Sequence, residues 1–92
     1  MNERTLASKY LNKFKLENKS SLVVRIPDSP VGRKPFDAFI FMDSMFMAIE
    51  FKLVGEKLLD HQSFSLEQVK RNGGIAKVIY FYPKGKVKET IL

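Results

Sequence analysis

The chain contains no cysteine and a single histidine among its 92 residues. The absence of cysteine excludes both a disulfide framework and a thiolate zinc site, and one histidine argues against a histidine-rich metal cage. Any bound metal must therefore rely mainly on oxygen ligands, which favours Mg²⁺ or Mn²⁺. A long uninterrupted apolar run is also missing. Charged residues (Asp37, Asp43, Glu50 and Lys52) interrupt the longest apolar region, residues 36 to 53, so it is not a membrane span.

The composition is that of a folded basic domain. Hydrophobic residues make up 45% and aromatic residues 12% of the chain, which argues against disorder. Its length predicts one small domain covering residues 1–92. Sixteen Lys and Arg against ten Asp and Glu give a net charge of +6 and a pI near 9.7, which favours a polyanionic partner. The N-terminus reads as a charged amphipathic stretch rather than a signal peptide, so we expect a cytoplasmic protein.

Periodicity and turn signals predict an α/β fold with a mixed sheet of four to five strands flanked by helices. The expected helices cover residues 2 to 17 and 61 to 72, the second stopped by Gly73-Gly74. The expected strands cover residues 22 to 26, 36 to 42, 46 to 52 and 75 to 82, with an optional edge strand at 87 to 91. A Pro/Gly loop occupies residues 27 to 35.

The central hairpin places two acids together. A polar turn at Asp43-Ser44 sets Met42 against Met45, and the same register carried down the ladder sets Asp37 opposite Glu50. Opposed side chains lie about 5 Å apart, and like charges there are destabilising. We therefore expect a cation to hold the two carboxylates.

Lys52 shares a strand face with Glu50, because side chains alternate with a period of two. Two acids and a lysine in one patch suit metal-assisted phosphodiester hydrolysis. The alternative is an ordinary sheet with polar residues at a solvated strand end. Against it, both faces of the hairpin are otherwise apolar, and charge occurs only at one end. Lys52 also has a structural alternative, a salt bridge to Glu50.

Two further candidates keep alternatives of their own. Glu3 is aligned with the apolar stripe of the first helix, where the alternative is an acid favoured by the helix dipole. Gln62 faces the core if the second helix starts near Asp60. If that helix starts at Ser65 instead, a capping box gives Gln68 a structural role.

The order of elements, with Asp37 on the second strand and Glu50-Phe51-Lys52 on the third, resembles the PD-(D/E)xK nucleases, whose core is restriction-endonuclease-like. Phe36 stands where the motif name has proline. His61-Gln62 followed by Gly73-Gly74-Ile75-Ala76 is similar to bacterial RecU-type Holliday-junction resolvases, and the compact length resembles stand-alone VRR-NUC nucleases of phages. The chain has no room for the longer N-terminal region and stalk-like insertion of RecU-type enzymes.

The resemblance implies a Mg²⁺-dependent DNA endonuclease, with Mn²⁺ as a substitute, that acts on branched DNA such as a four-way junction. Asp37 and Glu50 would bind the metal with the Phe51 backbone carbonyl, and Glu3 is implied as a helix-borne acid at the same ion. Lys52 would position or activate water. Gln62 would orient water or phosphate. A bacterial or phage origin is implied as well.

Basic residues outside this patch are candidates for contacts with DNA phosphates. The set is Arg33, Lys34, Lys70, Arg71, Lys84 and Lys86. For each one, an ordinary solvated surface position is the alternative. Symmetric cutting of a four-way junction needs two active sites, so resolvase activity implies a C2 homodimer. The rival functions are a nicking or flap-cutting nuclease, a cutting subunit of a larger complex, and a non-catalytic nucleic-acid-binding module.

Overall fold

The computed structural model describes residues 2–28 and 32–92. Residues 29–31 of the expected Pro/Gly loop lie outside this description. The helices are α1 (Glu3–Glu17) and α2 (Asp60–Arg71), and a short 3₁₀ turn, η1, spans Pro83–Gly85. The strands are β1 (Leu22–Arg25), β2 (Ala38–Met42), β3 (Met45–Leu53), β4 (Ile75–Phe81) and β5 (Val87–Ile91). Among the described residues, no helix combines the length and apolar character that crossing a membrane requires.

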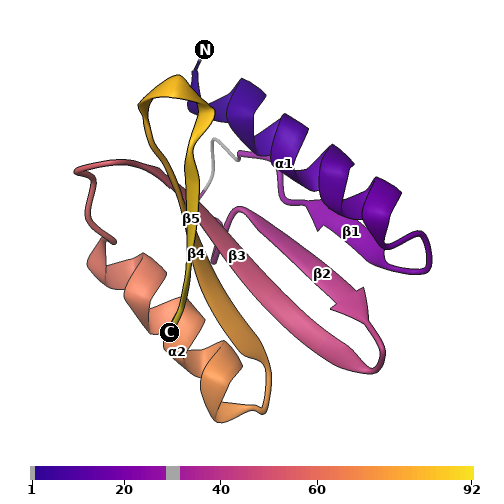
Figure 1. Ribbon diagram of the computed structural model, residues 1–92. Coiled ribbons are helices and arrows are strands. Elements are labelled where there is room, and N and C mark those ends of the chain that lie inside the picture. The colour runs from indigo at the N-terminus through magenta and orange to yellow at the C-terminus, as the bar shows by residue number, and fades with distance from the viewer. Residues whose placement is uncertain (1, 29–31) are drawn as a thin grey trace.

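The strands form one mixed sheet in the order β1-β2-β3-β4-β5 (Figure 1). β1, β2 and β3 pair antiparallel, β3 and β4 pair parallel across the α2 connection, and β5 returns antiparallel to β4. The predicted α/β class and element order are confirmed, and the optional edge strand at residues 87 to 91 is present.

The β2–β3 turn fixes the register of the central hairpin. Asp43 and Ser44 both have positive φ, 53° and 62°, which is the backbone of a two-residue type I′ turn. The resulting pairs run from Met42 opposite Met45 to Ala38 opposite Ile49. The predicted register is confirmed from Met42 to Ala38, where the pairing ends. Asp37, the next residue, still bonds to β3, because its N–H donates to Ile49 O.

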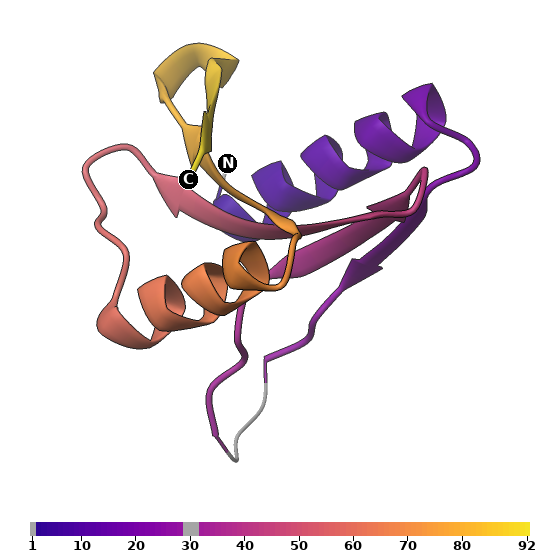
Figure 2. The same ribbon diagram turned by 90° about the horizontal axis from the view of Figure 1, so that it is seen from below.

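Each face of the sheet is covered by one helix, as the edge-on view in Figure 2 shows. Ala7 and Leu11 of α1 pack against one apolar face, whose centre is Ile40, Ile49 and Phe51. On the opposite face, Leu66 of α2 packs with a second cluster. That cluster comprises Phe36, Ala48, Ala76 and Val78. Successive side chains of β3 therefore point to opposite faces of the sheet and join two separate cores. Glu50 and Lys52 belong to the face that α2 covers.

The second helix begins at Asp60, so the alternative start at Ser65 is wrong. The reason is a local cap: the Leu59 N–H donates to Gln62 Oε1 at 2.9 Å, which satisfies a backbone group at the helix entry. The helix ends where Gly73 adopts φ 86°, a conformation that favours glycine. Gln62 therefore lies in the first turn of α2, at the end of the helix nearest Glu50.

Candidate functional site

Asp37 and Glu50 meet where the β2–β3 pairing ends. The backbone of Asp37 is held from both sides: its N–H donates to Ile49 O at 3.0 Å, and its carbonyl accepts from Ile26 N–H at 2.9 Å. The side chain of Asp37 is mostly buried, with 14% exposed, and Glu50 is 3% exposed. Two carboxyl groups thus converge in a place where water can solvate little of either one.

Glu50 is the less well satisfied of the two acids. Gln62 Nε2 donates to Glu50 Oε1 at 3.3 Å, whereas the buried Oε2 has no hydrogen-bond partner among residues 2–28 and 32–92. Burial, followed by the neighbouring Asp37 carboxylate, raises the pKa of Glu50 from 4.5 to about 9. Without a bound cation, Glu50 therefore holds a proton at neutral pH.

Asp37 stays ionised because donors surround it. Its Oδ2 accepts from the Phe51 N–H at 2.8 Å, and its Oδ1 lies 2.9 Å from Lys34 Nζ. Burial alone would raise the pKa of Asp37, but interaction with Glu50 and these two donors outweighs it, so the pKa is lowered. The N–H and C=O of one strand residue point to the same strand edge, so the Phe51 carbonyl faces the end of β2 as well.

Lys52 is buried on the same face without a direct acidic partner. Its exposed fraction is 8%, and among the described residues it forms no salt bridge. Its charge still reaches Glu50, whose pKa it lowers slightly against the larger effects of burial and Asp37. The alternative role of Lys52, a direct salt bridge to Glu50, is therefore not what the structure contains.

A second pair of acids borders the site. Glu3, in the first turn of α1, lies beside Glu56 of the β3–α2 connector. Burial, then the charge of Glu56 and a hydrogen bond with it, raises the pKa of Glu3 from 4.5 to about 7. Glu3 therefore lines the site from the first turn of α1, and its role there stays a prediction beside the helix-dipole alternative.

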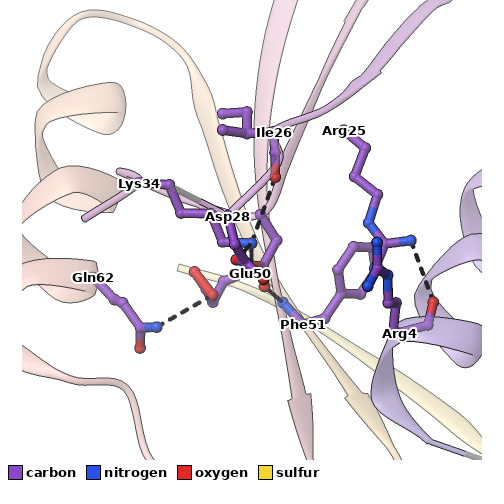
Figure 3. Close-up of polar contacts among 9 residues, drawn as sticks. Arg4, Arg25, Ile26, Asp28, Lys34, Glu50, Phe51 and Gln62 are labelled. Atoms are coloured by element: carbon purple, nitrogen blue, oxygen red, sulfur yellow. Dashed lines mark hydrogen bonds and ion pairs between the residues drawn. The ribbon is translucent and has the colours of Figure 1, made fainter. Parts of the chain in front are cut away.

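One cavity of about 610 Å³ joins these groups. It is lined by Glu3, Asp37, Glu50, Lys52 and Gln62, together with Lys34 and Glu56. Arg4 and Arg25 also line it, and the sequence analysis missed both (Figure 3). Arg25 Nη1 donates to Arg4 O at 3.2 Å and to Ser8 Oγ at 2.6 Å, so the end of β1 is fastened to α1.

The predicted DNA-contacting residues do not form one surface. Lys34 lies inside the site, where its Nζ pairs with Asp28 at 2.8 Å as well as with Asp37. Arg33 stands next to it and contacts His61 of α2. The other four do not line the cavity. Lys70 and Arg71 occupy the last turn of α2 near Glu67, and Lys84 and Lys86 lie at the β4–β5 turn.

The chemistry of this donor set fits a divalent cation. An unpartnered buried carboxylate oxygen and a raised glutamate pKa are what two facing acids show when no cation lies between them. Within the described ranges, no group of three or more His, Asp or Glu side chains forms a complete metal cage. Mg²⁺ does not need one, since it commonly uses one or two carboxylates and completes its shell with water and phosphate oxygens.

No protein-family model and no curated protein matches the chain. Among solved structures, it is similar to the 1.6 Å structure of Hjc from Archaeoglobus fulgidus, a Holliday junction resolvase from an archaeal hyperthermophile. The TM-score is 0.60 at 20% sequence identity, over 88% of this chain and 72% of that one. The chain has a restriction-endonuclease-like fold. The predicted fold class is confirmed, while the RecU-type or VRR-NUC assignment stays a prediction.

We predict that the metal-free protein loses stability as the pH rises from 7 to 9. Glu50 binds its proton more tightly in the folded state than in the unfolded chain, so its contribution is full below pH 4.5 and is lost towards about pH 9. The stability contributed by Glu3 is also lost as the pH rises, but this loss is complete by about pH 7. Denaturant unfolding in EDTA should show a decline of up to about 1.4 kcal/mol per pH unit.

Glu50→Gln should remove the decline between pH 7 and 9, because the amide does not titrate. Glu17→Gln, an exposed change at the end of α1, should leave the decline intact. Asp37 does not contribute to the slope between pH 7 and 9, because its pKa is lowered in the folded state. It changes the unfolding free energy only below about pH 3.8, where stability falls as the pH falls. Equal slopes in the wild type and Glu50→Gln would contradict the assignment.

Proposed function

We propose that this protein is a metal-dependent DNA endonuclease that hydrolyses phosphodiester bonds in branched DNA, with a four-way junction as its substrate. The observation that carries the proposal is the convergence of Asp37, Glu50 and buried Lys52 in one cavity at the end of the β2–β3 pairing. The restriction-endonuclease-like fold and the likeness to a Holliday junction resolvase support it.

Asp37 and Glu50 would hold Mg²⁺, or Mn²⁺ in its place, together with the Phe51 carbonyl. When bound, the ion would polarise the scissile phosphate and lower the pKa of a coordinated water. Asp37 is already ionised before the ion binds, because the Phe51 N–H and Lys34 stabilise its charge. Glu50 must give up its proton on binding, and Gln62 keeps one of its oxygens in a fixed orientation.

Lys52 would orient the attacking water and offset negative charge on the phosphate as the transition state forms. Its buried ammonium suits this role, since it is not neutralised by a direct salt bridge within the described parts of the chain. Arg4 and Arg25 would bind flanking phosphates at the rim of the cavity. Glu3 would support the ion from the side of α1.

We also propose a homodimer, since two symmetric cuts need two sites related by a two-fold axis. Apolar side chains remain exposed beyond the part of the sheet that α2 covers. Leu22 is 57% exposed and its cross-strand partner Phe41 is 48% exposed, and Phe64 of α2 is 66% exposed. Burial of this apolar surface against a second copy would support dimer formation.

We predict that Asp37→Asn, Glu50→Gln and Lys52→Ala each reduce Mg²⁺-dependent cleavage of a synthetic four-way junction by about a hundredfold or more. DNA binding should persist, because the lost groups serve the reaction rather than overall attraction. Gel assays of cleavage and fluorescence anisotropy of binding measure the two effects separately.

Asp43→Asn, Glu17→Gln and Lys19→Ala make the same chemical changes at exposed positions and should cut like the wild type. A linear duplex of the same sequence shows whether branching is required. Full activity in Asp37→Asn and Glu50→Gln would remove the nuclease assignment. Binding without any cleavage by the wild type would favour a non-catalytic module instead.

We predict that the affinity for junction DNA falls steeply as salt rises, because a chain of net charge +6 binds mainly through phosphates. A plot of log affinity against log salt concentration should be linear with a negative slope of about 0.9 per phosphate contact. Arg25→Ala should remove about one phosphate contact and so reduce the magnitude of that slope by about 0.9. A flat salt response would contradict phosphate-based binding.

A further inference from the structure

A second cavity, of about 320 Å³, adjoins the candidate metal site. Glu50 and Gln62 line both cavities, so they form a shared wall between them. The smaller cavity is also lined by Arg33, from the segment before β2, and by His61, from the first turn of α2. The roles proposed for the metal site leave this cavity and both of these residues unused.

Arg33 and His61 contact each other in a way that fixes the hydrogen-bonding capacity of both. Arg33 Nη1 lies 3.2 Å from His61 Nδ1. A guanidinium can only donate, so Nδ1 must be the acceptor and Nε2 must carry the imidazole proton. His61 therefore offers an N–H, and the other guanidinium N–H groups of Arg33 bond to none of the residues 2–28 and 32–92. Both residues present donors.

Arg33 is the cation of this cavity that has no acidic partner among the described residues, although Asp28 and Glu50 also line the cavity. Lys34 is engaged by Asp28 and Asp37, whereas Arg33 forms no salt bridge with any residue that the structure describes. An arginine fork beside an imidazole N–H matches the oxygens of a phosphate, which only accept hydrogen bonds. The two cavities share Glu50 and Gln62 in their lining, so they suit neighbouring phosphates of one strand.

We infer that Arg33 and His61 form a phosphate-binding subsite that holds the phosphodiester next to the scissile one. This inference rests on the proposed function for its substrate, DNA, but the ability to bind phosphate can be tested without cleavage. In the competing explanation, the contact only fastens the segment before β2 to α2, and no anion is bound.

The direct test uses the only histidine of the chain as a reporter. In metal-free protein at constant pH, inorganic phosphate is titrated while the ring signals of His61 are followed by ¹H–¹³C NMR, with chloride keeping the ionic strength constant. We expect a saturable shift that Arg33→Ala abolishes and that the charge-matched Lys19→Ala retains. No shift, or the same shift in Arg33→Ala, would overturn the subsite.

The second test measures junction cleavage. Arg33→Ala and His61→Ala should each raise KM about tenfold, as expected for loss of a charge-assisted hydrogen bond, and leave kcat within about twofold. His61→Gln keeps an N–H donor and should recover part of the loss. An unchanged KM, or a loss confined to kcat, would overturn the inference. If the wild type cuts no DNA, the proposed function fails and the NMR titration alone decides the subsite.

Discussion

The structure depends on one electrostatic constraint: the pairing of β2 with β3 forces two carboxyl groups together in a place with little water. Asp37 and Glu50 are neighbours because the Asp43-Ser44 turn fixes the register and the backbone of Asp37 is bonded on both sides. The protein meets the cost in two ways. Glu50 keeps its proton, and Asp37 is stabilised by the Phe51 N–H and by Lys34.

Lys34 gives this arrangement a direct relation to metal binding. Its ammonium lies 2.9 Å from Asp37 and supplies part of the positive charge that a cation would bring. Burial alone would lower the pKa of Lys34, but its hydrogen bonds to Asp28 and Asp37 raise it, so it stays charged. Ion binding at Asp37 therefore competes with an internal partner that is already in place, and Asp28 is available to hold Lys34 meanwhile.

The hairpin and its acids could be predicted because they follow from local rules. A two-residue turn sets the register, and alternation then assigns each side chain to a face. The same rules placed Lys52 beside Glu50. The sequence is compatible with two starts of α2, near Asp60 or at Ser65, and the Gln62 cap at Leu59 decides between them.

The parts that could not be predicted come from contacts between segments far apart in the chain. Arg4 and Arg25 enter the cavity because α1 packs along the sheet and Arg25 bonds across to Arg4 O and Ser8. Glu56 faces Glu3 only after the connector folds back, with Glu56 Oε1 accepting from the Leu53 N–H at 2.6 Å. No periodicity or turn signal encodes such contacts.

The most direct measurement is to locate a metal ion. Crystals soaked in Mn²⁺ and measured near the manganese absorption edge would place the ion by its anomalous signal. The account predicts a peak between the carboxylates of Asp37 and Glu50, within bonding distance of an oxygen of each, and no such peak in crystals of Asp37→Asn. If crystals soaked to saturation in Mn²⁺ show no anomalous peak at these carboxylates, or show peaks only elsewhere, the account is contradicted.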